Sequence, residues 1–235
     1  NVLTSDELRN EFGQATFFTA TDGNHGRGVA WAANRLGQKA VVHMPKGTTQ
    51  TRLQNIAKEG AQVDIQELNY DDCVRLAAKE ADETPRGVIV QDTAWDGYEE
   101  IPAWIMQGYG TMAMEAGEQL KAQGCERPTH IFVQAGVGSL AGAVVGYFSN
   151  LYADNLPTFV VVEAEAAACL YKGAAAGESG AAPFGALAAM MTMDEYKDLR
   201  NDIGLDENSK VLLFSTEGDT EPDRYKNIVW KGLDK

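Results

Sequence analysis

The stretch FFTATDGNHGRGVAWAA, residues 17–33, joins an apolar, β-rich run to an alanine-rich helical pattern. Three glycines crowd the turn between them. We expect Gly23 and Gly26 to adopt positive φ, and Gly28 to let the new helix pack closely. Because the first amide groups of a helix have no partner within it, this junction is suited to an anion. The stretch predicts a strand–turn–helix unit whose turn could hold a ligand.

Two polar residues of this turn can be interpreted in two ways. Asn24 could hydrogen-bond a ligand oxygen. Asp22 is unexpected, because a carboxylate beside an anion site costs free energy unless a cation binds to it. The alternative is structural: an Asx turn in which Asp22 or Asn24 caps the helix. The choice between a cap and a ligand cradle depends on the other motifs.

Apolar runs alternate with stretches of helical period along the chain. Strands are expected at Phe17–Ala20, Ala40–Met44, Gln62–Leu68, Val88–Gln91, His130–Gln134, Thr158–Glu163 and Val211–Ser215. Helices are expected at Gly28–Leu36, Thr49–Glu59, Tyr70–Glu83, Ile101–Gln123, Leu140–Asn150 and Asp223–Lys231. Near-continuous Val/Ile strands are typical of sheets covered on both faces. The alternation predicts an α/β fold with a doubly wound, mostly parallel sheet, whose ligands bind at the carboxyl ends of strands.

Two details qualify this pattern. Gly60 follows the second expected helix, where a left-handed cap would lie. The Gly/Ala-rich stretch at residues 169–191 contains no complete expected element. Neither an internal repeat nor a low-complexity linker is found in the sequence.

The composition narrows the class of protein. The chain has 235 residues, with 20 Lys and Arg against 34 Asp and Glu, a formal net charge of −14. Such a surface repels nucleic acid and anionic lipid, and no apolar run approaches the roughly 18 residues of a membrane span. The odd cysteine count predicts a reducing, cytoplasmic protein without a metal cluster. Its cysteines and histidines are scattered: Cys73, Cys125, Cys169, His25, His43 and His130.

A second motif, QAGVGSLAGAVVGYF at residues 134–148, follows an expected strand and opens an expected helix. Its loop consists of Gly136, Val137, Gly138, Ser139 and Leu140. Backbone amides and the Ser139 hydroxyl would be donors to a phosphate. The spacing is GxGxxxG, which differs from the dinucleotide fingerprint, although Glu163 ends the next strand about where a ribose-binding acid would lie. The alternative is a close-packed turn of small residues.

Two further stretches end strands with polar residues. VLLFSTEGDTEPDRY, residues 211–225, presents Ser215 and Thr216 to a ligand ring, or provides a helix cap at Asp219 or Thr220. VIVQDTAWDGYEEIPAWIMQGYGTM, residues 88–112, places Asp92 just beyond a strand, where a turn or cap residue is the simpler interpretation. The aromatic residues of that stretch form either a wall of a site or part of the core; they are Trp95, Tyr98 and Trp104.

Together these motifs resemble the pyridoxal-phosphate enzymes of fold type II, the tryptophan-synthase β and threonine-dehydratase group. Within that group the resemblance is stronger to the diaminopropionate ammonia-lyases, and is carried by TATDGNHGRGVAW, VQDTAWDGYEEIPAWIMQGYGT, QAGVGSLAGAV and LLFSTEGDT. It covers about residues 17–171 and from about 178 to the end. The resemblance implies a smaller α/β domain at 17–110 and a larger, cofactor-binding domain at 111–235 with part of the N-terminal region.

The resemblance also implies pyridoxal 5'-phosphate as cofactor. Asn24 would hydrogen-bond its phenolic oxygen, and the loop from Gly136 to Leu140 would surround its phosphate. Thr216, or alternatively Ser215, would face the ring nitrogen. A hydroxyl at that place, rather than a carboxylate, is suited to an elimination that needs only a modest electron sink.

For Asp22 the resemblance implies a chemical role. Serine and threonine dehydratases usually carry Ser there, but 2,3-diaminopropionate has a β-ammonium group that a carboxylate can receive. Asp22 could instead take a proton from Cα. The resemblance implies α,β-elimination of both enantiomers to pyruvate and ammonia by a homodimer, with Asp22 as base for the D form and Asp92 holding the substrate amine.

The chain departs from the family in two places. The family's Schiff-base lysine precedes the asparagine loop, whereas residues 1–16 contain no lysine, and Lys39, Lys46 and Lys58 follow the loop in unrelated contexts. The family also has a long stretch that we expect to be missing between Lys172 and Glu178. Either this is a truncated, inactive relative or these residues are part of a longer protein. We favour the second, and expect the lysine in a further upstream segment.

Three other functions remain open at this point. A serine/threonine dehydratase-like β-eliminase is disfavoured by Asp22 in place of Ser. A nicotinamide oxidoreductase using the 134–148 loop leaves the TDGNHG and FSTEGD motifs without a role. A non-catalytic relative is suggested by the missing lysine alone.

Overall fold

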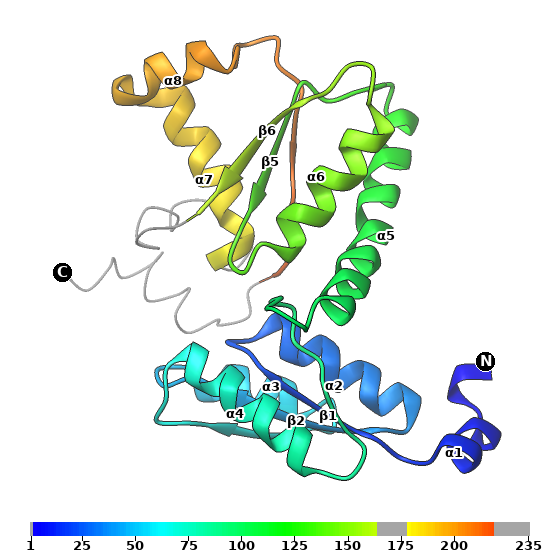
Figure 1. Cartoon of the computed structure of the whole chain (residues 1–235). Coiled ribbons are helices and arrows are strands. Elements are labelled where there is room, and N and C mark those ends of the chain that lie inside the picture. Colours follow the sequence, from blue (N-terminus) through cyan, green and yellow to red (C-terminus); the bar gives the residue numbers. More distant parts are fainter. Residues whose placement is uncertain (1, 164–177, 219–235) are drawn as a thin grey trace. The chain divides into compact units, whose positions relative to one another are not determined.

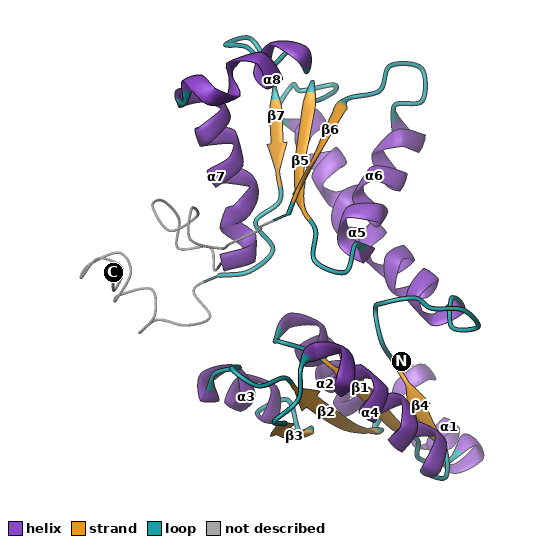
Figure 2. Cartoon of the chain, turned by 60° about the vertical axis from the view of Figure 1, so that its left-hand side comes forward, coloured by secondary structure: helices purple, strands orange, loops and turns teal. Residues whose placement is uncertain are grey.

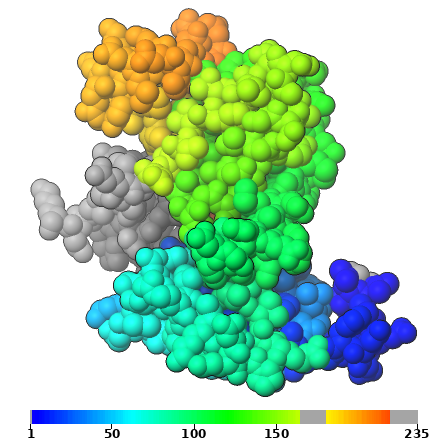
Figure 3. All heavy atoms as spheres, in the orientation of Figure 1, coloured from blue at the N-terminus to red at the C-terminus, as the bar shows by residue number. Residues whose placement is uncertain are grey.

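The computed structural model describes residues 2–163 and 178–218. The chain divides into two compact units, residues 1–102 and 103–235. Figure 1 traces them by sequence colour, and Figure 3 draws the same chain with all heavy atoms. The helix expected at 223–231, the cap expected at Asp219 or Thr220 and the segment expected to be missing after Lys172 all lie outside the described residues.

The first unit is built on a four-stranded parallel sheet of order β3-β2-β1-β4. Its strands are β1 (Thr16–Ala20), β2 (Lys39–Met44), β3 (Gln62–Ile65) and β4 (Gly87–Ile89). Its helical elements are η1 (Val2–Thr4), α1 (Asp6–Phe12), α2 (Asn24–Leu36), α3 (Gln50–Ala57) and α4 (Tyr70–Glu83). The strand order reverses direction after β3, which places the topological switch between β1 and β4.

Alternate residues of β2 show that both faces of this sheet are covered. Val42 and Met44 pack with residues of α2 and α3, including Ala30 and Ile56. Val41, which precedes Val42 in sequence, contacts the cluster that α4 forms on the other face. Because successive side chains of a strand point to opposite faces, α2 and α3 lie on one side and α4 on the other. The doubly wound arrangement expected from the sequence is confirmed (Figure 2).

The second unit contains a three-stranded parallel sheet of order β6-β5-β7. Its strands are β5 (His130–Gln134), β6 (Thr158–Val162) and β7 (Val211–Leu213). Its helical elements are α6 (Ser139–Leu151), α7 (Glu178–Thr192), η3 (Asp194–Tyr196), α8 (Lys197–Asp202) and most of α5 (Glu100–Ala122). The central strand, β5, is buried along its whole length.

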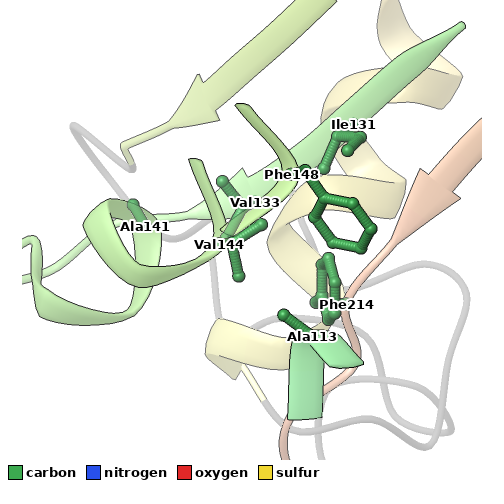
Figure 4. Close-up of a cluster of buried hydrophobic side chains, with 7 residues drawn as sticks. All are labelled: Ala113, Ile131, Val133, Ala141, Val144, Phe148 and Phe214. Atoms are coloured by element: carbon green, nitrogen blue, oxygen red, sulfur yellow. The ribbon is translucent and has the colours of Figure 1, made fainter. Parts of the chain in front are cut away.

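Figure 4 shows one core of this unit, where Phe148 lies between Ile131 and Phe214. Helices α5 and α6 contribute to that core, with Ala113 from α5. Phe132, the next residue of β5, packs on the opposite face with α7. Both faces of β5 are therefore apolar, as the near-continuous apolar run of this strand predicts.

All seven expected strands are present: His130–Gln134 matches β5 at both ends, and the other six differ by at most three residues at an end. The helices are less complete. Helix α2 begins at Asn24 rather than Gly28, and α1, α7 and α8 were not expected from the sequence. Helix α7 occupies the second half of the stretch 169–191, where the expectation of no complete element is wrong. Its glycines and the internal Pro183 weaken the helical signal, while its alanines favour a helix.

The glycines of the opening turn play different parts from those expected. Gly23 has a φ of 167°, which is extended backbone, and Gly26 lies inside α2 instead of adopting positive φ. A Cβ atom at Gly26 would overlap the methyl group of Thr21 and lie 2.9 Å from Cγ1 of Val42. At Gly28 a Cβ atom would meet nothing within 4 Å. Gly26, not Gly28, is the close-packing glycine of α2.

The left-handed conformation expected at Gly60 is confirmed by a φ of +94°. That residue lies between α3 and β3, so the chain can reverse into the strand without steric conflict.

Gly26→Ala is expected to destabilise the protein by about 1–3 kcal/mol, because the added methyl group has no space between α2 and the sheet. Gly28→Ala is the matched control in the same helix, and should stabilise by up to about 1 kcal/mol through the higher helix propensity of alanine. Denaturant unfolding of both variants checks this prediction. Equal effects of the two substitutions would contradict the packing described for Gly26.

Candidate active site

In the first unit, candidate site residues lie where β1 and β4 end. These strands are parallel neighbours, so their carboxyl ends lie at the same edge of the sheet. The Thr21–Asn24 turn follows β1, and Gln91 and Asp92 lie just beyond β4. Asp22 and Asn24 are exposed, whereas the side chain of Asp92 is only 12% exposed. Two carboxylates predicted from separate motifs thus follow adjacent strands.

The turn after β1 is held by its own residues and by α3. The amide of Gly23 donates to Oγ1 of Thr21 at 3.0 Å, and Nη1 of Arg52 donates to the carbonyl oxygen of Asp22 at 3.0 Å. Gly23 occupies the cap position of α2, where no side chain in the described residues makes a capping hydrogen bond. The cap by Asp22 or Asn24 considered from the sequence is therefore wrong. The first amide groups of α2 have no partner within the helix itself.

His25 lies beside Asp92. Its Nε2 is 2.8 Å from the carbonyl oxygen of Val90, and its Nδ1 is 3.8 Å from Oδ2 of Asp92. Because a carbonyl oxygen only accepts, Nε2 carries a hydrogen and the ring is fixed in orientation. The imidazole of the TDGNHG motif therefore connects the start of α2 to the end of β4.

Tyr70, the first residue of α4, also belongs to this edge of the sheet. Its hydroxyl oxygen accepts a hydrogen bond from Nε2 of Gln91 at 2.9 Å. Burial raises the pKa of the Tyr70 hydroxyl from its usual 10.0 to about 12, and the negative charges of Asp92 and Asp22 add to the increase. The hydroxyl therefore keeps its proton at physiological pH.

The aromatic residues after β4 are not part of a buried core. Trp95 stacks on Tyr98 with ring centroids 4.2 Å apart, and Trp95 is 37% exposed. The hydroxyl of Tyr98 accepts from the amide of Gln91 at 2.7 Å. Trp104, in α5, is more exposed than Trp95. The Tyr98 hydroxyl thus holds the loop after Asp92 against the residues just beyond β4.

In the second unit, candidate site residues follow β5. Gly136 and Val137 are exposed, and Gly138 has a φ of +94°, which favours glycine. Helix α6 begins at Ser139 with Gly138 as its cap residue, and no side chain in the described residues caps it. A Cβ atom at either glycine would meet nothing within 4 Å. The loop therefore presents unobstructed amide groups at a helix start, as a phosphate requires.

A hydroxyl-bearing segment lies beside this loop. Ser215 and Thr216 follow β7, the parallel neighbour of β5, and both are exposed. Nε2 of Gln134 donates to Oγ1 of Thr216 at 2.8 Å. The buried Oε1 of Gln134 has no hydrogen-bond partner among the described residues. One buried amide, that of Gln134, thus links the strand before the glycine loop to the hydroxyl of Thr216.

The three lysines considered from the sequence are all exposed. Lys39 begins β2 and is exposed, and Lys58 ends α3 and is exposed. Lys46 forms an ion pair with Glu67 at 2.6 Å. An additional lysine upstream of this sequence stays a prediction.

Other site types find little support in the described part of the chain. No group of three or more His, Cys, Asp or Glu residues there could hold a metal ion. None of the described helices combines the length and apolar character that a membrane crossing requires.

Each unit thus carries polar or glycine-rich residues at the carboxyl ends of its parallel strands, a polar turn in the first and a glycine loop in the second, and comparison with known proteins identifies the class. The family model of the pyridoxal-phosphate dependent enzymes matches residues 1–209. The chain belongs to this family and has its fold type II architecture.

Within the family, the chain is similar to diaminopropionate ammonia-lyase of Salmonella typhimurium. The two are 42% identical over 298 aligned positions, which cover 98% of this chain and 74% of that protein. The apo structure of Escherichia coli diaminopropionate ammonia-lyase has 41% identity and a TM-score of 0.86, covering 97% of this chain and 71% of that one. The same enzyme in complex with D-serine has 37% identity and a TM-score of 0.86, with coverage of 97% and 73%.

The length of the Salmonella alignment bears on the stretch expected to be missing. It spans 298 positions, more than the 235 residues of this chain. The relative therefore has residues within the aligned region for which this chain has no counterpart. Such residues agree with the expectation of a longer family segment, whose place after Lys172 lies outside the described residues.

Three residues of this edge were not predicted from the sequence: Arg52, Tyr70 and Gln91. A signal was available for Tyr70, because it starts the helix after β3 and thus lies at the same carboxyl edge as Asp22. Gln91 was expected only as the last residue of a strand. Arg52 looked like an ordinary helical residue, and only the folded structure shows its bond to the Asp22 carbonyl.

Tyr70→Phe is expected to lower stability near neutral pH by about 1 kcal/mol, through the lost hydrogen bond. The raised pKa in the folded protein means that the unfolded chain ionises first, so wild type should lose stability between pH 10 and pH 12. Relative to wild type, the variant should therefore gain about 1–2 kcal/mol across that window, after discounting for partial exposure. Denaturant unfolding at pH 9 and pH 11 tests this. A pH-independent difference would show that Tyr70 ionises as in the unfolded chain.

Proposed function

We propose that this protein catalyses the pyridoxal-phosphate dependent α,β-elimination of 2,3-diaminopropionate to pyruvate and ammonia. The observation that carries the proposal is 42% identity to a diaminopropionate ammonia-lyase over 98% of the chain. The Asp22 carboxylate in the asparagine turn adds to it, because a substrate with a second amino group brings a cation to that turn. The chain is a carbon–nitrogen lyase of the ammonia-lyase type.

The residues present fit the cofactor. The amides of the loop from Gly136 to Leu140, with the Ser139 hydroxyl, would hold the phosphate, and Thr216 or alternatively Ser215 would face the ring nitrogen. Asn24 would hydrogen-bond the phenolic oxygen. When bound, pyridoxal phosphate supplies an electron sink for the pair left on Cα after proton removal.

The two carboxylates of the first unit, Asp22 and Asp92, suit a substrate that carries two amino groups. Asp92 holds the substrate amine, and its burial beside His25 keeps the carboxylate in one place. Asp22 is exposed at the mouth of α2, where it receives the β-ammonium group or removes the Cα proton of the D enantiomer. The Cα–H electron pair forms the Cα–Cβ double bond as the Cβ–N bond breaks and ammonia leaves with its electron pair. The released enamine hydrolyses in water to pyruvate and a second ammonia.

Several finer features belong to the same proposal. The two domains would be residues 17–110 and 111–235 with part of the N-terminal region. The enzyme would act as a homodimer, as the family resemblance implies. A cytoplasmic location is supported by the free thiols of Cys73 and Cys125, which suit a reducing compartment. Its strongly negative charge supports a small-molecule substrate rather than nucleic acid or membrane.

A dehydratase-like β-elimination of serine is the second candidate, favoured by one finding. A similar enzyme, Escherichia coli diaminopropionate ammonia-lyase, has been solved in complex with D-serine. Serine has a neutral hydroxyl where 2,3-diaminopropionate has a β-ammonium group. The negative charge of Asp22 therefore favours 2,3-diaminopropionate over serine as the substrate.

The direct test is to load the protein with pyridoxal phosphate and then to measure its activity on each substrate in turn. We expect pyruvate and ammonia from both enantiomers of 2,3-diaminopropionate, at a kcat/KM well above that for serine or threonine. Borohydride reduction and mass mapping of the labelled peptide would identify the Schiff-base lysine. Preferential turnover of serine would instead establish the dehydratase, and a bound cofactor without turnover would establish a non-catalytic relative.

Asp22→Asn should damage the two enantiomers unequally. Removal of a general base costs about 10²–10⁴-fold, and we expect that loss in kcat/KM for the D enantiomer. The L enantiomer should lose less, through weaker holding of the β-ammonium group, for which about 1.5–3 kcal/mol is typical. The absorption spectrum of the bound cofactor serves as the folding control. If kcat/KM fell equally for both enantiomers while the cofactor stayed bound, Asp22 would position the substrate and would not be the base that removes the Cα proton of the D enantiomer.

A further inference from the structure

Gln91 is a fully buried polar residue that the proposed reaction does not yet use. Its side chain pairs with both backbone groups of Ala20, the last residue of β1. Oε1 accepts from the Ala20 amide at 2.9 Å, and Nε2 donates to the Ala20 carbonyl oxygen at 3.1 Å. The side-chain amide thus takes the place of a backbone partner where β4 has already ended. It holds the strand from which the Asp22 turn emerges.

The same nitrogen serves two more groups. Nε2 of Gln91 lies 2.9 Å from the Tyr70 hydroxyl oxygen and 3.1 Å from Oδ1 of Asp92. An amide nitrogen has only two hydrogens for these two oxygens and the carbonyl of Ala20. With one hydrogen directed to Ala20, the other is shared between Tyr70 and Asp92. Gln91 is thus bonded to the Asp92 carboxylate and to the strand that carries Asp22.

The other oxygen of Asp92 is flanked as well. Oδ2 lies 3.8 Å from Nδ1 of His25, whose ring is fixed by the Val90 carbonyl. Gln91 and His25 therefore face the two carboxylate oxygens from different elements, one beyond β4 and one in α2. The hydrogen bond from Gln91 restricts rotation of the Asp92 carboxylate, which favours a substrate ammonium group at one defined place.

We infer that Gln91 is a positioning residue for substrate binding: it orients the Asp92 carboxylate and, through Ala20, holds the strand end that carries Asp22. This inference rests on the proposed function, because it assigns Asp92 to the substrate amine. It extends that function by naming the buried amide that holds both carboxylate-bearing segments. Gln91 acts through these residues and does not itself touch the substrate.

Gln91→Glu tests the inference with an isosteric change. The variant keeps an oxygen that can accept from the Ala20 amide, but it replaces the donating nitrogen with a second oxygen about 3 Å from Asp92. Two carboxyl groups at that distance cannot both ionise easily, so the pair should retain a proton to higher pH. Carboxyl-carbon NMR of protein labelled with ¹³C-aspartate, with the Asp92 signal assigned through Asp92→Asn, should show titration at least about one pH unit higher than in wild type.

Kinetics supply a second readout. In Gln91→Glu we expect KM for 2,3-diaminopropionate to rise about tenfold or more, with a smaller change in kcat, and the acidic limb of the kcat/KM profile to move to higher pH. The cofactor spectrum should be unchanged, because the phosphate loop belongs to other strands.

Gln66→Glu is the matched control. Nε2 of Gln66 donates to Oδ1 of Asp64 at 2.9 Å, so this variant also replaces a glutamine that bonds an aspartate near the end of a strand of the same sheet. Asp64 additionally accepts from His43 at 2.9 Å and has no part in the proposed reaction. In the control, KM and the pH profile should stay at wild-type values.

Tyr70→Phe keeps the inference testable where Gln91→Glu does not fold. Without the tyrosine oxygen, the shared hydrogen of Gln91 goes to Asp92 alone, and the Asp92 signal should titrate at lower pH than in wild type. An unchanged Asp92 titration in Tyr70→Phe, or equal changes in KM for Gln91→Glu and Gln66→Glu, would overturn the inference. Absence of turnover by wild type would refute the proposed function, whereas the NMR titration needs no turnover and still decides the role of Gln91.

Discussion

The parallel pairing of β1 between β2 and β4 is the constraint on which the polar edge of the first unit, with Asp22 and Asp92, depends. Parallel strands end at a common edge, so residues that are some 70 positions apart in sequence follow neighbouring strands. The pairing also leaves a gap, because β4 ends before β1 does. The buried amide of Gln91 fills that gap with hydrogen bonds to Ala20, and so extends the sheet to the point where the polar turn begins.

The second unit repeats this principle with a different result. The central strand, β5, is buried throughout and leads directly into the glycine loop before α6. The rigid core around Phe148 and Val133 fixes the start of that helix, and the loop itself remains open. A packed strand with an unobstructed helix start gives an anion site that costs little to organise, because the core already provides most of the ordering.

The strands could be predicted because a short, continuous apolar run between turn residues is typical of a buried strand. The glycine loop after β5 could be predicted because it lies between such a run and a helical pattern. The helix containing Pro183 could not, because local propensity gives conflicting signals there and packing against β5 and β6 decides the outcome. The sequence interpretation assigned close packing to Gly28, whereas the structure shows it at Gly26. Only the fold shows which glycine faces Thr21 and Val42. Likewise, nothing local distinguishes Gln91 from other strand-ending polar residues until β1 is placed beside it.

The division of the candidate residues between the two units has an evolutionary consequence. The glycine loop and the Gln134–Thr216 hydrogen bond belong to the second unit, whereas Asp22, Asp92 and the amide between their strands belong to the first. Under the proposed function, mutations that alter substrate choice can therefore accumulate in one unit while retention of the cofactor is selected in the other. A lineage built this way can diversify its chemistry without first losing its prosthetic group.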